Sequence, residues 1–224
     1  KRVKFNDLIR GDVSIDLAAQ SDPVIRRKDG DYLYNLPSVV DDIDMNITHI
    51  IRGEDHITNS GIQLEIFNAL GANTPIFGHN SLLVSENGEP FSKRNVASSI
   101  EQIREQGIEP NALNSLIASI GSSVDIQIFK SIDDIAKYFE ITSLGKAPAR
   151  YDKNQLVRLN SQLISSYSFE EISKIISNNT VDFSEEFWDC IKQNISEISE
   201  INIWLKIINE PVNHNLDIDK NYLN

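Results

Sequence analysis

Cysteine is almost missing from this chain, because Cys190 is the only one among its 224 residues. A single thiol excludes an intramolecular disulfide and a zinc site built from several cysteines, so we expect no metal site, and in particular no zinc, in this chain. Cys190 stands close to Trp188 in an apolar stretch. We therefore predict that it is a buried core residue.

Long apolar runs are missing as well. No stretch approaches the roughly 20 apolar residues of a membrane span, and the opening KRVKFNDLIR lacks the apolar segment of a secretory signal. We expect a cytoplasmic protein with no membrane partner. Hydrophobic residues still make up 40% of the chain, which at this length is enough for a buried core and for more than one domain.

Positive charge is scarce: 21 Lys and Arg stand against 33 Asp and Glu, giving a net charge of −12. Because phosphate contacts rely on Lys and Arg, this composition argues against a general nucleic-acid binder. Within the acidic chain there is one basic cluster, formed by Lys146, Arg150, Lys153 and Arg158. A local contact to nucleic acid and a solvated helix face explain this cluster equally well.

The first part of the chain alternates strand and helix signals. The β-branched run ITHIIR at 47–52 predicts a buried strand, and a helix should follow it, capped by Asn59 or Ser60 and ended by Gly71. One apolar helix face is expected from Ile62, Ile66, Phe67 and Leu70. A second apolar run at 81–84 precedes the tight-turn pair Asn87-Gly88. Strand, helix and strand form the unit of a nucleotide-binding α/β fold.

Beyond Ser98 the strand signals fade, and we predict an all-α region. Each expected helix has a start signal. These signals are Pro110, Ser131, the capping box of Ser168 with Glu171, Ser184 and Ser196.

The sequence FSKR at 91–94 directly follows the Asn-Gly turn. The adjacent cations Lys93 and Arg94, introduced by Ser92 on a loop, suit the neutralisation of a polyphosphate in a transition state. Taken alone the motif is weak evidence for a phosphate site, because charged surface loops often contain the same residues by chance.

Arg52 ends the predicted buried strand and opens the sequence RGEDH. Ligands of open α/β sheets sit at that end of the strands, and arginine grips a carboxylate with two hydrogen bonds. A structural ion pair of Arg52 with Glu54 or Asp55 is an equally good interpretation on physical grounds. Tyr34 and Ser38 are four residues apart, so near the start of a helix their hydroxyls face one ligand.

Asp41 and Asp42 suit a metal or acid–base chemistry, but a solvated pair explains them more simply. His56 and His79 have no cysteine or histidine partner at metal-ligand spacing, and we predict hydrogen-bonded structural roles for both.

Taken together and in this order, these motifs resemble the glutamyl-tRNA synthetases. The similarity runs from FNDLIRGDVSIDLAAQSDPVIRRKDG through the stretch from YNLPSVVDD to RGEDHITNSGIQLEIFNALGA and on to GHNSLLVSENGEPFSKR, and continues more loosely to Trp204. Glutaminyl relatives share RGEDH and SKR, but their anticodon part is made of β-barrels, whereas an all-helical second half is expected here.

The resemblance implies ligation of glutamate to tRNA through a glutamyl-adenylate, with ATP and Mg²⁺, by a cytoplasmic monomer. Its catalytic residues would be Ser92, Lys93 and Arg94, with Lys93 on the ATP phosphates. Arg52, Tyr34 and Ser38 would bind glutamate. The rest of the ATP site would comprise Glu54, Asp55, His56, Leu82 and Leu83, and the basic cluster Lys146, Arg150, Lys153 and Arg158 would contact tRNA. A neutral amide would leave a buried Arg52 unsatisfied, which would exclude glutamine.

The resemblance also implies four regions. Residues 1–30 would end the acceptor-binding insertion, 31–97 would form the second half of a Rossmann-type catalytic domain, 98–165 would contact the tRNA stem, and 166–224 would begin a helical anticodon-binding domain. In the family, the HIGH-type motif lies upstream of the point that matches Lys1, so this chain alone should not form adenylate.

One departure from the family pattern is Pro90, which stands where the signature loop usually carries another cation. This change would slow activation or mark a copy that charges the glutamine tRNA in place of the glutamate tRNA. Two other functions remain open: a paralogue that glutamylates a base in tRNA, whose short relatives lack a helical half, and a non-catalytic or decayed tRNA-binding module.

Overall fold

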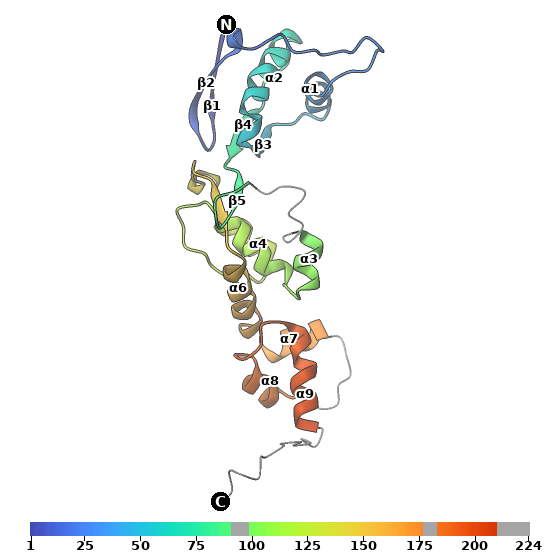
Figure 1. The fold of residues 1–224 in the computed structure, drawn as a ribbon, viewed down its shortest axis with the longest axis vertical. Coiled ribbons are helices and arrows are strands. Elements are labelled where there is room, and N and C mark those ends of the chain that lie inside the picture. Colours follow the sequence, from blue (N-terminus) through green and yellow to red (C-terminus); the bar gives the residue numbers. More distant parts are fainter. Residues whose placement is uncertain (91–98, 177–182, 210–224) are drawn as a thin grey trace, which may run out of the picture. The chain divides into compact units, whose positions relative to one another are not determined.

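The computed structural model describes residues 1–90, 99–176 and 183–209 (Figure 1). Two compact units divide the chain. The first takes residues 1–95, 117–127 and 135–152, and the second takes 96–116, 128–134 and 153–224, each over its described part. No helix in the described ranges is long and apolar enough to cross a membrane.

The first unit is of the α/β type. Its elements are β1 (Arg2–Asp7), β2 (Gly11–Asp16), the 3₁₀ turn η1 (Leu17–Ala19), α1 (Asn35–Asp44), β3 (His49–Gly53), the 3₁₀ turn η2 (Glu54–His56), α2 (Ile57–Ala69), β4 (Ile76–Asn80), β5 (Leu83–Ser85), the 3₁₀ turn η4 (Ile141–Ser143) and β6 (Ala149–Tyr151). Strands β1 and β2 form an antiparallel hairpin, while β3 pairs with β4 and β5 with β6 in parallel. A strand–helix–strand unit is present in β3, α2 and β4, but its second strand was wrongly placed, because the predicted run at 81–84 contributes to β5 and pairs with β6. The prediction of a buried first strand was also wrong, since Ile51 of β3 is 48% exposed.

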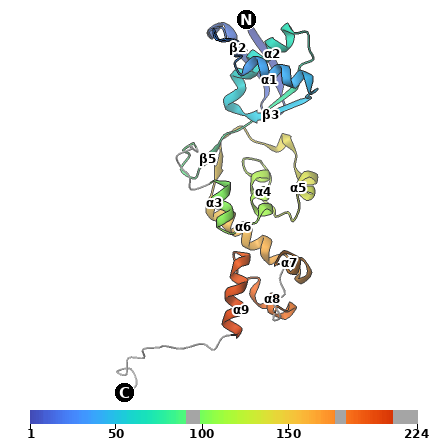
Figure 2. The same cartoon turned by 90° about the vertical axis from the view of Figure 1, so that its right-hand side faces the viewer.

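The hydrophobic core of this unit lies between its helices and strands. Its buried members are Val3, Val39, Leu64, Phe67 and Phe77. They come from β1, α1, α2 and β4. Helices α1 and α2 lie side by side in both views (Figures 1 and 2), and β1 is tied to β4 by the Leu8 N–H, which donates to the Phe77 carbonyl at 2.9 Å. This packing fixes the end of β3 against the start of both helices.

Helix α2 differs from the prediction at its start. It begins at Ile57, so Asn59 and Ser60 lie inside it, and Ser60 is fully buried. The predicted cap was wrong because the Ser60 hydroxyl is used within the fold, 3.1 Å from the His56 carbonyl. The end was predicted correctly: Gly71, at φ +68°, closes a Schellman motif in which the Ala72 N–H donates to the Phe67 carbonyl at 3.0 Å.

The apolar face predicted for α2 was only partly right. Phe67 is buried, but Leu70 is 52% exposed, and polar Ser60 and Gln63 belong to the buried face. Ile62, Ile66 and Leu70 instead line an open pocket together with the segment after η1. Both faces of this helix carry apolar residues, so sequence periodicity does not identify the side that packs on the sheet.

The remaining described elements are helical. They are α3 (Ile100–Glu105), α4 (Pro110–Ser119), α5 (Ile132–Tyr138), α6 (Lys153–Ser165), α7 (Phe169–Ile176), α8 (Glu185–Ile191), the 3₁₀ turn η5 (Ile198–Glu200) and α9 (Ile201–Asn209). The capping box is confirmed, because the Glu171 N–H donates to Ser168 Oγ at 3.2 Å and the Ser168 N–H to Glu171 Oε2 at 2.8 Å. Ser184 likewise caps α8, accepting from the Phe187 N–H at 3.2 Å.

Two local predictions about this region were wrong. Strand β6 interrupts the expected run of helices, because its three residues gain strand character only by pairing with β5, where the Ala149 N–H donates to the Leu82 carbonyl at 2.9 Å. Cys190 is exposed, because α8 buries Phe187, Trp188 and Ile191 and turns the cysteine away from that face. The domain boundaries expected at 30, 97 and 165 stay predictions, although residues 117–127 and 135–152 cluster with the first unit.

Candidate functional site

Arg52 lies near the C-terminal end of β3, where ligands bind in parallel α/β sheets. Its guanidinium is held by three side chains. Nη1 donates to the Tyr34 hydroxyl at 3.3 Å, and Nη2 donates to Gln63 Oε1 at 2.7 Å and to Ser60 Oγ. The guanidinium also lies over the Phe77 ring, 5.4 Å from its centroid. Its position is therefore set by α1, α2 and β4 together.

The structure contradicts one interpretation of Arg52, the structural ion pair with Glu54 or Asp55. Among the described residues, Arg52 forms no ion pair, whereas the neighbouring Glu54 is paired with Arg10. Burial lowers the pKa of Arg52, and the nearby Tyr34, Asp42 and Asp55 only partly oppose this effect. An arginine side chain nonetheless stays protonated in proteins. A half-buried cation without a carboxylate partner is the feature expected of an anion-binding site.

Three of the five N–H donors of Arg52 are used by these contacts. Nε is buried and has no partner within the described part of the chain. The same is true of Asn35 Oδ1, an acceptor at the start of α1. Both atoms are covered by the fold, so the donor of Arg52 that stays open to an anionic ligand is the second hydrogen of Nη1, on the exposed side of the guanidinium.

Tyr34 and Ser38 reach Arg52 from the start of α1, as their spacing predicted. The Ser38 N–H donates to the Tyr34 carbonyl at 3.1 Å, which places both residues on one helical turn. Gln63 connects this turn to Arg52, because its Nε2 donates to Ser38 Oγ at 2.7 Å. The three residues predicted to bind glutamate thus meet at one place, while their roles remain predictions.

Behind Arg52 lies a buried polar chain that sequence reasoning missed in part. His79 is fully buried, with Nε2 2.7 Å from Ser60 Oγ and Nδ1 2.6 Å from Asp7 Oδ2. Burial raises the pKa of Asp7, but hydrogen bonds from the Arg10 N–H, from His79 and from the Ile9 N–H outweigh it, so the pKa is lowered. Burial also lowers the pKa of His79, although Asp7 opposes this effect.

These pKa shifts agree with one assignment of the hydrogen bonds around His79. An ionised Asp7 accepts, so a neutral His79 carries its proton on Nδ1, and its Nε2 is an acceptor. Ser60 therefore accepts from Arg52, and its one hydroxyl hydrogen is shared between His79 Nε2 and the His56 carbonyl, 2.7 and 3.1 Å from Oγ. The structural role predicted for His79 is confirmed by these bonds. Ser60 and Gln63 were missed, and the available signal was the occurrence of two polar residues three positions apart on a helix otherwise rich in apolar ones.

The residues predicted to bind ATP lie next to Arg52. Glu54, Asp55 and His56 form η2 directly after β3. Glu54 accepts from Arg10 Nη2 and, at 3.2 Å, from the Leu82 N–H. Leu82 and Leu83 are 39% and 42% exposed. Glu54 and Leu82 are thus brought together. The exposed side chains of Leu82 and Leu83 offer an apolar surface of the kind that binds an adenine base.

Other predicted site residues are not assembled. Ser92, Lys93 and Arg94 lie outside the described residues. Lys146 and Arg150 belong to the first unit, and Lys153 and Arg158 to the second, so their grouping remains a prediction. Among the described residues no group of His, Cys, Asp and Glu is suited to hold a metal ion.

Burial raises the pKa of Asp42, and Arg52 opposes this effect while Asp41 adds to it.

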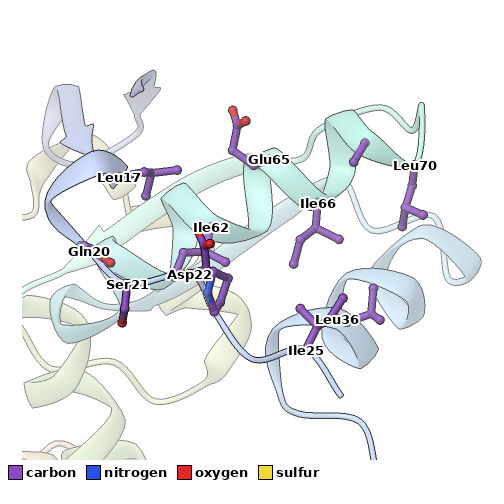
Figure 3. Close-up of a pocket in the computed structure, with 12 residues that line it drawn as sticks. Leu17, Gln20, Ser21, Asp22, Ile25, Leu36, Ile62, Glu65, Ile66 and Leu70 are labelled. Carbon is purple, nitrogen blue, oxygen red and sulfur yellow. The ribbon is translucent and has the colours of Figure 1, made fainter. Parts of the chain in front are cut away.

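A separate pocket of about 360 Å³ lies beside α2 (Figure 3). Its lining is mostly apolar, and none of the side chains that contact Arg52 contributes to it. The apolar members labelled in the figure are Leu17, Ile25, Leu36, Ile62, Ile66 and Leu70. This composition does not suit a charged substrate, so the Arg52 cluster is the better candidate site.

The family model described as tRNA synthetases class I (E and Q), catalytic domain, matches residues 1–158. "Glutamate--tRNA ligase 1" of Parvibaculum lavamentivorans is 43% identical over 210 residues, which are 93% of this chain and 47% of that protein. The protein of the same name from Chelativorans sp. is 43% identical over 227 residues, covering 99% of this chain and 50% of the relative. The chain thus spans about half the length of the curated relatives it matches.

Solved structures agree with these matches. A glutamate tRNA ligase from Elizabethkingia meningosepticum, crystallised in complex with its amino acid, superposes with a TM-score of 0.76 at 27% identity, over 92% of this chain and 46% of that one. The glutamate-tRNA synthetase from Elizabethkingia anophelis gives 0.73 at 26% identity, over 91% and 46%. The similarity therefore extends over both units of the chain.

Proposed function

The chain belongs to the catalytic-domain family of class I tRNA synthetases for glutamate and glutamine, and from this premise we propose that it is part of an enzyme that uses ATP to join glutamate to tRNA. The curated relatives named above carry the name glutamate–tRNA ligase, which supports this choice within the family. The observation that carries the proposal is the Arg52 cluster, a half-buried cation without a carboxylate partner among the described residues, at the C-terminal end of a parallel strand.

The proposed reaction has two steps. An α-carboxylate oxygen of glutamate attacks the α-phosphorus of ATP, so that glutamyl-adenylate forms and pyrophosphate leaves. A hydroxyl of the terminal tRNA ribose then attacks the glutamyl carbonyl carbon, and AMP leaves. The protein has little covalent chemistry to perform in such a reaction, and its contribution is positioning and charge stabilisation.

In this proposal Arg52 binds the side-chain carboxylate of glutamate, and Tyr34 and Ser38 line the same pocket. The support is that all three side chains are tied into one hydrogen-bonded group with donors left over. Charge-assisted hydrogen bonds between arginine and a carboxylate are among the strongest in proteins. Glutamine would offer Arg52 a neutral amide and leave the buried charge uncompensated.

ATP would lie next to glutamate, against η2 and the Leu82–Leu83 backbone. Glu54 is held by Arg10 and by the Leu82 N–H, which makes this edge rigid. Lys93, with Arg94 and Ser92, would neutralise the phosphates, and Mg²⁺ would accompany ATP as part of the substrate. No zinc is part of the proposal.

The tRNA would be contacted by the basic residues Lys146, Arg150, Lys153 and Arg158, and the enzyme would act as a monomer in the cytoplasm, where ATP and tRNA are available. The glutamate tRNA is the expected substrate. Pro90, an exposed residue that bridges to Val84 at the start of the signature loop, keeps charging of the glutamine tRNA as the specialised alternative.

The test is charging of purified glutamate and glutamine tRNAs, separately, by the full-length protein with ATP, Mg²⁺ and labelled glutamate. Charging of either tRNA supports the ligase, and the preferred tRNA identifies the substrate. If neither tRNA is charged while both are bound, the chain belongs to a non-catalytic tRNA-binding protein and the ligase proposal is wrong.

A further inference from the structure

Gln63 is a buried polar residue between the two elements that form the candidate glutamate pocket. It is 1% exposed, and it lies on α2. Its Oε1 accepts from Arg52 Nη2 at 2.7 Å, and its Nε2 donates to Ser38 Oγ at 2.7 Å. One amide group therefore joins the arginine of β3 to the serine of α1.

This contact has only one possible polarity. A guanidinium has donors and no acceptors, so the carbonyl oxygen of the Gln63 amide must face Arg52. The amide nitrogen then faces Ser38, and the Ser38 oxygen must accept from it. Ser38 keeps its own hydroxyl hydrogen, whose partner in the fold is the Asn35 carbonyl at a long 3.4 Å. That hydrogen is available to a ligand at little cost.

The same reasoning applies to Tyr34. Its hydroxyl oxygen accepts from Arg52 Nη1, so its hydrogen is left to donate. The second hydrogen of Arg52 Nη1 is also unused by the contacts described above. Arg52, Ser38 and Tyr34 thus present hydrogen-bond donors, and the ligand group that satisfies several donors at once is one that only accepts.

We propose that Gln63 is a positioning residue that sets the selectivity of this pocket for a carboxylate over a carboxamide. It does so without contacting the ligand, by holding Arg52 and by turning the Ser38 hydroxyl into a donor. A glutamine side chain would place its NH₂ group against one of these donors, whereas glutamate only accepts. The inference rests on the proposed function, because it assumes that the pocket holds the glutamate side chain.

Gln63→Glu tests the polarity with almost no change of shape. A carboxylate at this position still accepts from Arg52 but also accepts from Ser38, so the Ser38 hydroxyl is turned away from the ligand and the charge of Arg52 is partly paired. We expect the KM for glutamate to rise roughly 10- to 100-fold, with a smaller change in kcat, as for loss of one charge-assisted hydrogen bond. Activation of glutamine should change less, so that the ratio of kcat/KM for the two amino acids falls at least about tenfold.

The assay is amino-acid-dependent ATP–pyrophosphate exchange by the full-length protein in the presence of tRNA, with glutamate and glutamine measured separately. Asn68→Asp is the matched control, because it adds the same charge to an exposed position of α2. Gln63→Met, which keeps the length of the side chain and removes both hydrogen bonds, should also lower selectivity. Should Gln63→Glu fail to fold, Gln63→Met decides the matter.

Coupling to Ser38 separates a positioning role from a merely structural one. If Gln63 acts through Ser38, then Ser38→Ala should change selectivity in the wild-type protein but add little in the Gln63→Glu protein. The inference is overturned if the Gln63 variants melt at a lower temperature while their ratio of glutamate to glutamine activation equals that of the wild type. If the wild-type protein gives no glutamate-dependent exchange, the proposed function fails first, and the inference fails with it.

Discussion

Replacement of Arg52 by lysine and by alanine gives the sharpest test of the candidate site. Lysine keeps the charge but offers a single ammonium in place of a planar fork. Such a group cannot hold Tyr34, Ser60 and Gln63 and still serve a ligand, because those contacts already use three of the arginine donors. A carboxylate on the remaining Nη1 donor would be stabilised by about 1.5–3 kcal/mol, the range for one charge-assisted bond.

That free energy corresponds to a loss of roughly 10- to 10²-fold in kcat/KM for glutamate, with Arg52→Lys toward the lower end and Arg52→Ala toward the upper. The loss should lie mainly in KM in glutamate-dependent ATP–pyrophosphate exchange by the full-length protein with tRNA. Arg52→Ala also leaves buried Gln63 Oε1 without its donor, at about 1–3 kcal/mol of stability, so melting curves must accompany the kinetics. Lys4→Ala, which removes an exposed cation from β1, is the control. An unchanged KM for glutamate in Arg52→Ala would show that the carboxylate role is wrong.

Two further predictions concern stability. The free energy of unfolding should fall as the pH drops below about 6.5, because buried His79 has a lowered pKa and stays neutral while the same histidine in the unfolded chain takes up a proton. Below pH of about 4, Asp7 adds to this loss, because its pKa is also lowered in the folded protein. Urea titrations at several pH values should show that His79→Gln lacks the loss between pH 7 and 5, and an identical pH profile would contradict the assignment. Asn160→Ala should destabilise the second unit by about 2–4 kcal/mol, since this fully buried amide accepts from the Glu109 N–H at 2.8 Å and donates to the Gly107 and Ser196 carbonyls at 3.1 and 2.6 Å. The exposed Asn68→Ala should cost less than about 0.5 kcal/mol in the same denaturation experiment, and equal effects would refute the assignment to hydrogen bonding.

Local chemistry made part of the fold predictable. The glycine that ends α2 and the capping box of Ser168 with Glu171 depend on residues within a few positions of one another, and each has the expected role in the structure. The run before Arg52 also forms a strand, but its partner β4 was not predicted. Strand β6 was not predictable in this way, because it exists only by pairing with β5, more than sixty residues earlier in the chain.

In the candidate site too, local features were predictable from the sequence and long-range contacts were not. The placement of Arg52 at a strand end and the four-residue spacing of Tyr34 and Ser38 are local signals, and the structure brings these residues together. Ser60 looked like a helix cap because its near neighbours fit that role. Its actual partner is His79, 19 positions away, which in turn meets Asp7 72 positions away. No short-range pattern reports such contacts, so the polar support behind Arg52 requires the folded structure.

Family membership and the chemistry of the site differ in what they indicate about the amino acid that the enzyme would bind. The matching family model covers synthetases for both glutamate and glutamine, so it leaves the choice of substrate side chain open. We propose that the hydrogen bonds in the first unit narrow this choice, because Ser60 and Gln63 together occupy the Nη2 donors of Arg52, while His79 and Asp7 support Ser60 from behind. The hydrogens that then remain on Arg52 Nη1, Tyr34 and Ser38 are all available to donate. In the proposed function they would favour a carboxylate, which only accepts, over a carboxamide, whose NH₂ group also donates, so the polarity of these hydrogen bonds would add to the effect of the charge.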